Sequence, residues 1–180
     1  MTLRATGRGR ISVSRVRSLQ GAIVLTLGMA LMACGATPER PEASLAPSHS
    51  ESLSEQRAGV VFAALNQVGT PYQYGGQSPR EGFDCSGLVW YTHRHIGLSV
   101  PRTAHEQSGQ IQRVSPRSLE PGDLLFFRTK GSGPSHVSIY IGDGQFVHAP
   151  SSGRPVSTER LDNPYWSRRF LHAGHYYEQE

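Results

Sequence analysis

Cysteine is scarce in this chain, with only Cys34 and Cys85 among 180 residues. Two cysteines exclude a disulfide-rich scaffold, which needs several paired thiols to replace a large core. No Cys-x-x-Cys or His-Glu-x-x-His spacing is present, so a zinc site built from Cys85 and two histidines is a weak alternative. We expect neither a metal nor an organic cofactor.

Acidic residues are absent from the first 33 positions, which hold five arginines. The remaining residues carry 13 basic and 14 acidic side chains, so the pI near 9.4 reflects the N-terminal segment alone. This distribution implies no basic surface for polyanions, so we expect no nucleic-acid partner.

Long apolar runs are also missing. The run from Gly21 to Ala33 has 13 residues, too short to span a bilayer comfortably, and it follows an arginine-rich start as in a secretory signal. It ends in Leu31-Met32-Ala33-Cys34, which resembles a bacterial lipobox. We therefore expect residues 1–33 to be a signal peptide and Cys34 to be lipidated, with Gly35 favouring the periplasmic face of the outer membrane. An ordinary signal peptide and an uncleaved anchor are the alternatives.

The rest of the chain divides into a linker and one globular domain. Residues 34–51 contain Cys34 and a flexible stretch rich in Pro, Ala, Ser and Glu, whereas residues 52–180 suffice for a single core. Helical patterns come first, including one that begins with a capping box at Ser52-Leu53-Ser54-Glu55. Strand patterns follow at 123–128, 136–141, 145–149 and 170–177. This order predicts an α+β fold with helices packed on an antiparallel sheet.

Cys85 stands at the predicted start of a helix that runs to Ile96. Asp84 is a good N-cap residue because its carboxylate accepts backbone N–H groups of the first turn. The positive end of the helix dipole then favours the thiolate, which is the nucleophilic form. Taken alone, a buried structural cysteine is the better interpretation.

Two histidines could supply the base that a cysteine nucleophile needs. His136 opens one strand of a predicted hairpin and His148 ends the other. A simple two-residue turn at Asp143-Gly144 would place them on opposite faces. We predict a three-residue loop or an equivalent bulge, which sets His148 opposite Ser138 and on the same face as His136.

Six short motifs resemble the NlpC/p60 family of cell-wall cysteine peptidases when taken in order. They are Tyr72-Gln73-Tyr74-Gly75-Gly76, Gly82-Phe83-Asp84-Cys85-Ser86-Gly87, Pro101-Arg102-Thr103, Pro121-Gly122-Asp123-Leu124, His136-Val137-Ser138-Ile139-Tyr140-Ile141-Gly142 and Phe146-Val147-His148-Ala149. The run Asn163-Pro164-Tyr165-Trp166 is similar to the Spr-type murein endopeptidases of that family. One departure is the loop at 77–81, which is about one residue longer and is expected to border the cleft.

The resemblance implies a circularly permuted papain-like fold and a set of site residues. It makes Cys85 the nucleophile, His136 the general base and His148 the orienting residue. Tyr72 matches a tyrosine that faces the nucleophile and helps hold the oxyanion. Asp84, Ser86 and Arg102 match positions associated with substrate contacts, although helix capping explains the first two equally well and Arg102 is more simply structural.

The implied function is a peptidoglycan endopeptidase that cleaves an amide in murein peptide stems. The Spr-like ending favours the meso-diaminopimelate–D-alanine cross-link, and the broader family favours the γ-D-glutamyl–diaminopimelate bond. We expect a monomer that is tethered to the membrane through Cys34. The alternative is a catalytically idle wall-binding lipoprotein with the same fold.

Overall fold

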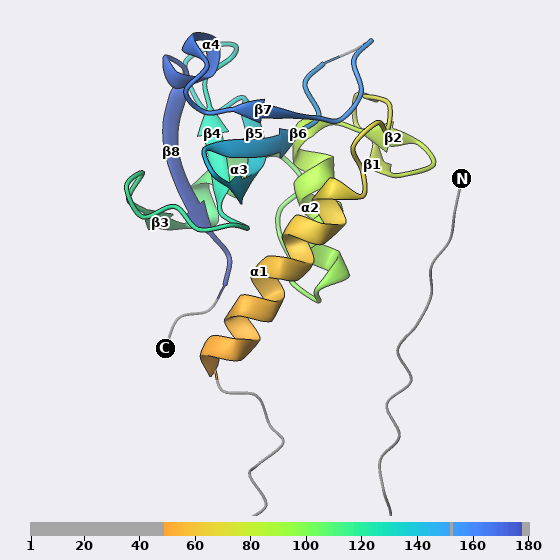
Figure 1. Cartoon of the computed structure of the whole chain (residues 1–180). Helices are drawn as coiled ribbons and strands as arrows, with labels where there is room; N and C mark the ends of the chain where they lie inside the picture. Colours follow the sequence, from red (N-terminus) through yellow and green to blue (C-terminus); the bar gives the residue numbers. More distant parts are fainter. Residues whose placement is uncertain (1–48, 152, 178–180) are drawn as a thin grey trace, which may run out of the picture. The chain divides into compact units, whose positions relative to one another are not determined.

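The computed structural model of the protein describes residues 49–151 and 153–177 (Figure 1). The predicted signal sequence, Cys34 and the linker up to residue 48 lie outside the described residues and stay predictions. Within the described ranges, none of the helices is both long enough and apolar enough to cross a membrane.

A six-stranded sheet forms the centre of the domain, with neighbouring strands antiparallel in the order β3-β8-β4-β5-β6-β7. Its strands are β3 (Gln112–Val114), β4 (Leu124–Phe127), β5 (His136–Gly142), β6 (Gln145–His148), β7 (Ser157–Arg160) and β8 (Phe170–His175). Helices precede most of the strands, which confirms the predicted α+β class.

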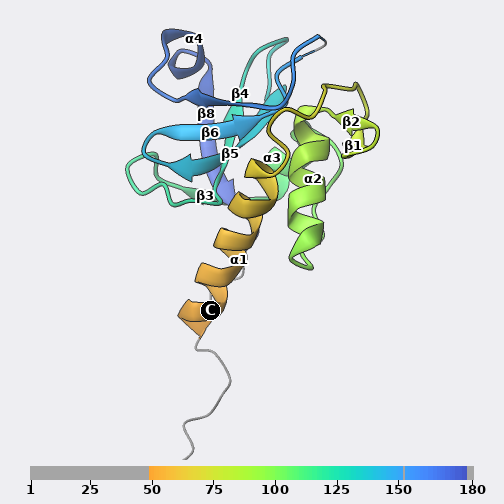
Figure 2. The ribbon, with the colours of Figure 1, turned by 45° about the vertical axis from the view of Figure 1, so that its right-hand side comes forward.

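Within residues 49–151 and 153–177, four helices accompany the sheet. They are α1 (His49–Leu65), α2 (Cys85–His95), α3 (Ala104–Gln110) and α4 (Pro164–Ser167). Figures 1 and 2 show α1 and α2 side by side, with α4 at the far end of the molecule from the start of α1. The predicted capping box at Ser52 is wrong, because α1 is already helical at His49 and Glu51 lies in its first turn, where an acidic side chain suits the helix dipole.

The central strands are buried on both faces. Leu124 and Phe126 of β4 pack into a core with α1 and α2, whereas Leu125 and Phe127 pack into a second core that contains Trp166. Successive side chains of a strand point to opposite faces, so the continuous apolar run in β4 satisfies both cores.

Two strands of the sheet were not predicted from the sequence. The edge strand β7 has the polar sequence Ser-Thr-Glu-Arg and is only partly buried. The other strand, β3, is short and mostly exposed, and it pairs with β8. Neither carries the apolar alternation by which a half-buried strand is recognised. A small hairpin of β1 (Gln77–Ser78) and β2 (Gly82–Phe83) also forms within the predicted loop before Cys85.

The hairpin between β5 and β6 has the predicted register. Its turn is two residues long, Asp143 and Gly144, with positive φ angles of 52° and 71°. The pairing then shifts between Tyr140 and Gly142, so that Ile139 faces Val147. One further step puts His148 opposite Ser138, as the bulged alternative requires.

Candidate active site

Cys85 is the first residue of α2, and Asp84 caps that helix as predicted. The Asp84 carboxylate accepts a hydrogen bond from the Gly87 N–H at 2.7 Å. Gly87 must be glycine, because a Cβ atom there would collide with the carbonyl oxygen of Gly76. The turn before the helix is thereby held tightly against its first residues.

The Cys85 thiol is half-buried between α2 and the start of β5. Burial raises its pKa, while backbone N–H groups of Val137, Ser86 and Cys85 itself act in the opposite direction. The predicted preference for the thiolate is therefore wrong. The favourable helix start is present, but the loss of solvation outweighs it.

His136 and His148 form a buried pair, with Nε2 of His136 lying 2.9 Å from Nδ1 of His148. Burial lowers the pKa of His136 to about 4. Burial, together with the charges of His136 and Arg154, lowers the pKa of His148 to about 3. Both imidazoles are therefore neutral at pH 7, and one donates a hydrogen bond to the other.

Trp166 completes the surroundings of this pair. Its ring stacks on His136 with a centroid distance of 5.2 Å and meets His148 edge-on at 4.9 Å. Trp166 is itself only 7% exposed, so it shields both imidazoles from solvent. In the sequence this tryptophan belongs to the run at residues 163–166, which predicts no place for it in the site.

A cavity of about 1030 Å³ brings the predicted residues together. Cys85, His136, His148 and Tyr72 all line it. Burial, followed by the charges of Cys85 and Asp84, raises the pKa of Tyr72. These four side chains therefore face one space that a substrate can enter.

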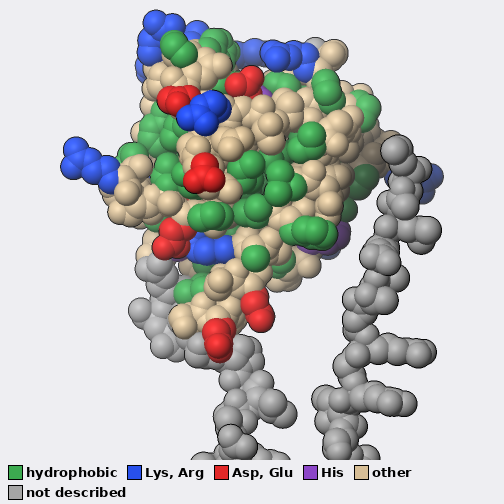
Figure 3. All heavy atoms as spheres, viewed as in Figure 1, with side chains coloured by type: hydrophobic (Ala, Val, Ile, Leu, Met, Phe, Trp, Pro, Cys, Tyr) green, Lys and Arg blue, Asp and Glu red, His purple; other side chains and the backbone are tan. Residues whose placement is uncertain are grey.

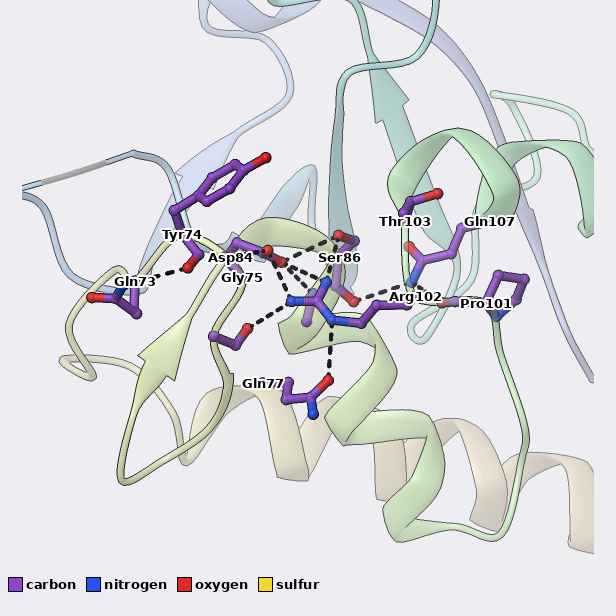
Figure 4. A network of polar contacts seen from close by, with 12 residues as sticks. Gln73, Tyr74, Gly75, Gln77, Asp84, Ser86, Pro101, Arg102, Thr103 and Gln107 are labelled. Atoms are coloured by element: carbon purple, nitrogen blue, oxygen red, sulfur yellow. Dashed lines mark hydrogen bonds and ion pairs between the residues drawn. The ribbon is translucent and has the colours of Figure 1, made fainter.

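Asp84, Ser86 and Arg102 also line the cavity, but they are engaged with one another (Figure 4). Both terminal nitrogens of Arg102 donate to the Asp84 carboxylate at 2.9 Å, and one of them also donates to the Ser86 hydroxyl at 3.0 Å. Arg102 further reaches the carbonyl oxygen of Gly76 at 3.1 Å. This network supports the structural interpretation of Arg102, because it ties the loop before the helix to the helix start.

The loop at 77–81 does not border the cavity, contrary to the prediction. Gln77 instead turns toward Arg102 and accepts a hydrogen bond from its Nε at 3.1 Å. Tyr74 and Gly75 form that part of the wall, and Tyr74 is 84% exposed.

Charged residues missed by the sequence analysis line the cavity as well. Lys130 lies on one wall, and Arg154 and Glu159 lie on the side formed by the β6–β7 connection and β7. No motif marks these positions. They lie at the cavity because the pairing of the strands places their segments there. Among residues 49–151 and 153–177, no group of three or more His, Cys, Asp or Glu side chains is placed to hold a metal ion.

Comparison with known proteins gives a consistent picture for this domain. A profile of the NlpC/P60 family matches residues 69–175. The crystal structure of the NlpC/p60 domain of the peptidoglycan hydrolase SagA superimposes with a TM-score of 0.59 and 32% identity, covering 67% of this chain and 98% of that domain.

Two curated relatives carry more specific names. Murein DD-endopeptidase MepH of Escherichia coli (strain K12) is 37% identical over 135 residues, covering 72% of this chain and 49% of MepH. Gamma-DL-glutamyl hydrolase of Bacillus subtilis (strain 168) is 36% identical over 148 residues, covering 81% of this chain and 35% of that hydrolase. The chain thus spans about half the length, or less, of these two relatives.

Proposed function

The chain belongs to the NlpC/P60 family, and we propose that it is a peptidoglycan endopeptidase that uses Cys85 as its nucleophile. The observation that carries the proposal is the cavity shared by the Cys85 thiol and the buried His136–His148 pair. A nucleophile, a base and a group that orients the base are what covalent amide hydrolysis requires.

The first step transfers a proton from Cys85 to His136. The shared hydrogen bond orients His136 when its Nε2–H donates to Nδ1 of His148, which leaves Nδ1 of His136 as the basic nitrogen. As this nitrogen takes the thiol proton, the sulfur attacks the amide carbonyl carbon. Because burial favours the neutral forms of both partners, the ion pair forms during the attack rather than before it.

The tetrahedral intermediate places negative charge on the former carbonyl oxygen. The Cys85 backbone N–H and the Tyr72 hydroxyl are the donors proposed to hold that oxygen. Protonated His136 is stabilised by the stacked ring of Trp166 and by the acceptor on His148. His136 then gives its proton to the leaving amine, a thioester forms on Cys85, and water hydrolyses it with His136 again acting as base.

Two amide bonds are candidates for cleavage. The name of MepH specifies a DD-endopeptidase, and together with the Spr-like run at residues 163–166 it supports the meso-diaminopimelate–D-alanine cross-link. The name of the Bacillus relative specifies hydrolysis of a γ-DL-glutamyl bond, which favours a γ-glutamyl amide. In a peptidoglycan stem, the broader family resemblance makes that amide the γ-D-glutamyl–diaminopimelate bond. Asp84, Ser86 and Arg102 are proposed to contact the stem peptide from the cavity wall in addition to their structural roles.

Location and attachment form the remaining part of the proposal. The lipobox-like sequence supports acylation at Cys34 and a tether to the outer membrane, with the domain acting as a monomer in the periplasm.

Digestion of purified cross-linked muropeptides, with the products resolved by mass, tests the proposal. Cleavage of the cross-link turns a dimer into two monomers, whereas γ-DL cleavage shortens the stems. An amidase would release whole stems from the sugar, and an acyltransferase would give products without addition of water. The absence of any cleavage product would favour the idle wall-binding alternative.

A further inference from the structure

Four cationic side chains surround a second, shallower pocket of about 440 Å³. Arg128 and Lys130 follow β4, while Arg168 and Arg169 precede β8, and we call this cluster the basic pocket. Figure 3 shows Lys and Arg side chains gathered over α4 at the top of the molecule. The nearly balanced total charge of the domain implies no basic surface, yet four cationic side chains are concentrated at this one place.

The pairing of β4 with β8 creates this cluster. Phe127 faces Phe170 across the two strands, and the Arg128 N–H donates to the carbonyl oxygen of Arg169 at 2.8 Å. Two cationic pairs that are about forty positions apart in the chain thus lie side by side.

Hydrogen bonds hold the backbone on one side of the basic pocket and the Arg169 side chain on the other. The Ser135 hydroxyl accepts hydrogen bonds from the N–H groups of Thr129 and Lys130, each at 2.9 Å. On the other side, Arg169 donates to the carbonyl oxygen of Tyr165 at 2.9 Å and lies 3.8 Å over the Tyr165 ring. The backbone at Lys130 and the side chain of Arg169 are therefore held in place on the two sides of the basic pocket.

The four cations lack acidic partners within residues 49–151 and 153–177. None of them forms an ion pair there, and no acidic side chain from those ranges lines the basic pocket. Like charges held together repel one another, and a bound anion would relieve that repulsion. The guanidinium groups also present paired N–H donors that match a carboxylate.

Thr129 and Lys130 line both the basic pocket and the active-site cavity. We propose that the basic pocket is a second binding site for the substrate polymer, in which it holds free carboxylates of peptidoglycan stems beyond the amide being cleaved. This proposal rests on the proposed function. Peptidoglycan suits such a site because γ-linked glutamyl and diaminopimelyl residues keep free carboxylates that repeat along the strand.

Binding of the intact polymer tests this second site without cleavage. The full chain carrying Cys85→Ala is sedimented with purified sacculi, with and without Arg128→Gln/Arg168→Gln. We expect the double substitution to weaken binding about tenfold at low salt and to reduce its dependence on salt. Arg113→Gln/Arg117→Gln is the matched control, because both arginines are exposed and neither lines the two pockets. Its binding should stay within about twofold of the parent.

Blocking the ligand provides the second arm of the experiment. Sacculi whose carboxylates have been converted to amides should bind the test and control proteins equally weakly. In the enzyme with Cys85 intact, the ratio of activity on sacculi to activity on a short soluble stem peptide should fall by a similar factor in the test variant. Arg128→Gln alone serves if the double variant fails to fold, since Arg168 also donates to the carbonyl oxygen of Pro164 at 2.9 Å.

Several results would overturn this inference. Equal binding of the test and control variants to untreated sacculi would do so. So would a fold-loss of binding on amidation that is as large for the test variant as for the control. Loss of binding to vesicles of anionic phospholipid, with sacculus binding intact, would assign the basic pocket to lipid phosphates instead. If sacculi bind as expected but wild-type protein cleaves nothing, the proposed function fails and the binding site stands.

Discussion

At the scale of single residues, burial governs the protonation of the three principal site residues. It raises the pKa of Cys85 and lowers the pKa values of His136 and His148 to about 4 and about 3. A neutral thiol and a neutral imidazole that line one cavity can react only if the imidazole is well oriented. The hydrogen bond between the two histidines therefore carries much of the proposed mechanism.

Replacement of His148 tests this orienting role. His148→Ala should lower kcat about 100-fold with little change in KM, because the substrate still binds while the base loses its orientation. His148→Asn should recover much of the loss, since its side-chain oxygen can accept the hydrogen bond from His136. Steady-state kinetics on a soluble stem peptide would measure both. Equal activity of the Ala and Asn variants would contradict an orienting role.

The local geometry that brings the proposed site residues to one cavity was largely predictable from the sequence, whereas their catalytic roles stay predictions. Asp84 was recognisable as an N-cap, and the turn residues at 143–144 limited the hairpin to two registers, of which one unites the histidines. The resting protonation of Cys85 was not predictable, because it depends on how deeply β5 covers the sulfur. The position of Trp166 over His136 depends in the same way on tertiary packing.

At the scale of elements, the start of α2 depends on one carboxylate. Asp84 accepts hydrogen bonds from Gly87 and Gly75 at 2.7 and 2.9 Å and pairs with Arg102. Its side chain is 13% exposed, so solvent replaces these contacts poorly. Cys85 is the next residue, and its placement follows from this cap.

Removal of the Asp84 carboxylate should destabilise the protein and impair the site together. Asp84→Ala should lower the free energy of unfolding by about 2–4 kcal/mol, because it removes the cap and leaves Arg102 without its partner. Asp162→Ala is the control, since Asp162 also pairs with an arginine but is 67% exposed. Denaturant unfolding should show little change for that control. Similar losses for the two variants would contradict this account of the helix start.

The elements that the sequence failed to reveal share one property. The strand β7 is polar because it is an edge strand, and the basic pocket exists only because β4 pairs with β8. Local patterns predict which segments are helices or strands, whereas they do not fix which exposed side chains become neighbours. Arg154 and Lys130 line the candidate active-site cavity, although no local pattern in the sequence predicts it.

At the scale of the whole molecule, buried neutral histidines link stability to pH. His93 of α2 is fully buried, and burial lowers its pKa to about 4. Its Nδ1 lies 2.9 Å from the carbonyl oxygen of Val89, and its Nε2 has no partner among the described residues. The unfolded chain binds a proton near pH 6.5, so the unfolded state gains protons before the folded state does.

Stability should therefore be fully present above pH 6.5 and fall as the pH decreases toward 4. His93 alone accounts for a loss on the order of 3 kcal/mol across this window. His93→Phe should flatten this part of the profile, because the ring no longer titrates. Denaturant unfolding at several pH values would measure the slope, and a slope in His93→Phe as steep as in the wild type would contradict the assignment.

The most direct test of the account as a whole compares the wild-type chain with Cys85→Ala on cross-linked muropeptides. The wild-type protein should release stem fragments that have gained one water at an amide, and the variant, with its fold intact by thermal unfolding, should release none. Unchanged cleavage by Cys85→Ala would contradict the central claim that this thiol performs the chemistry.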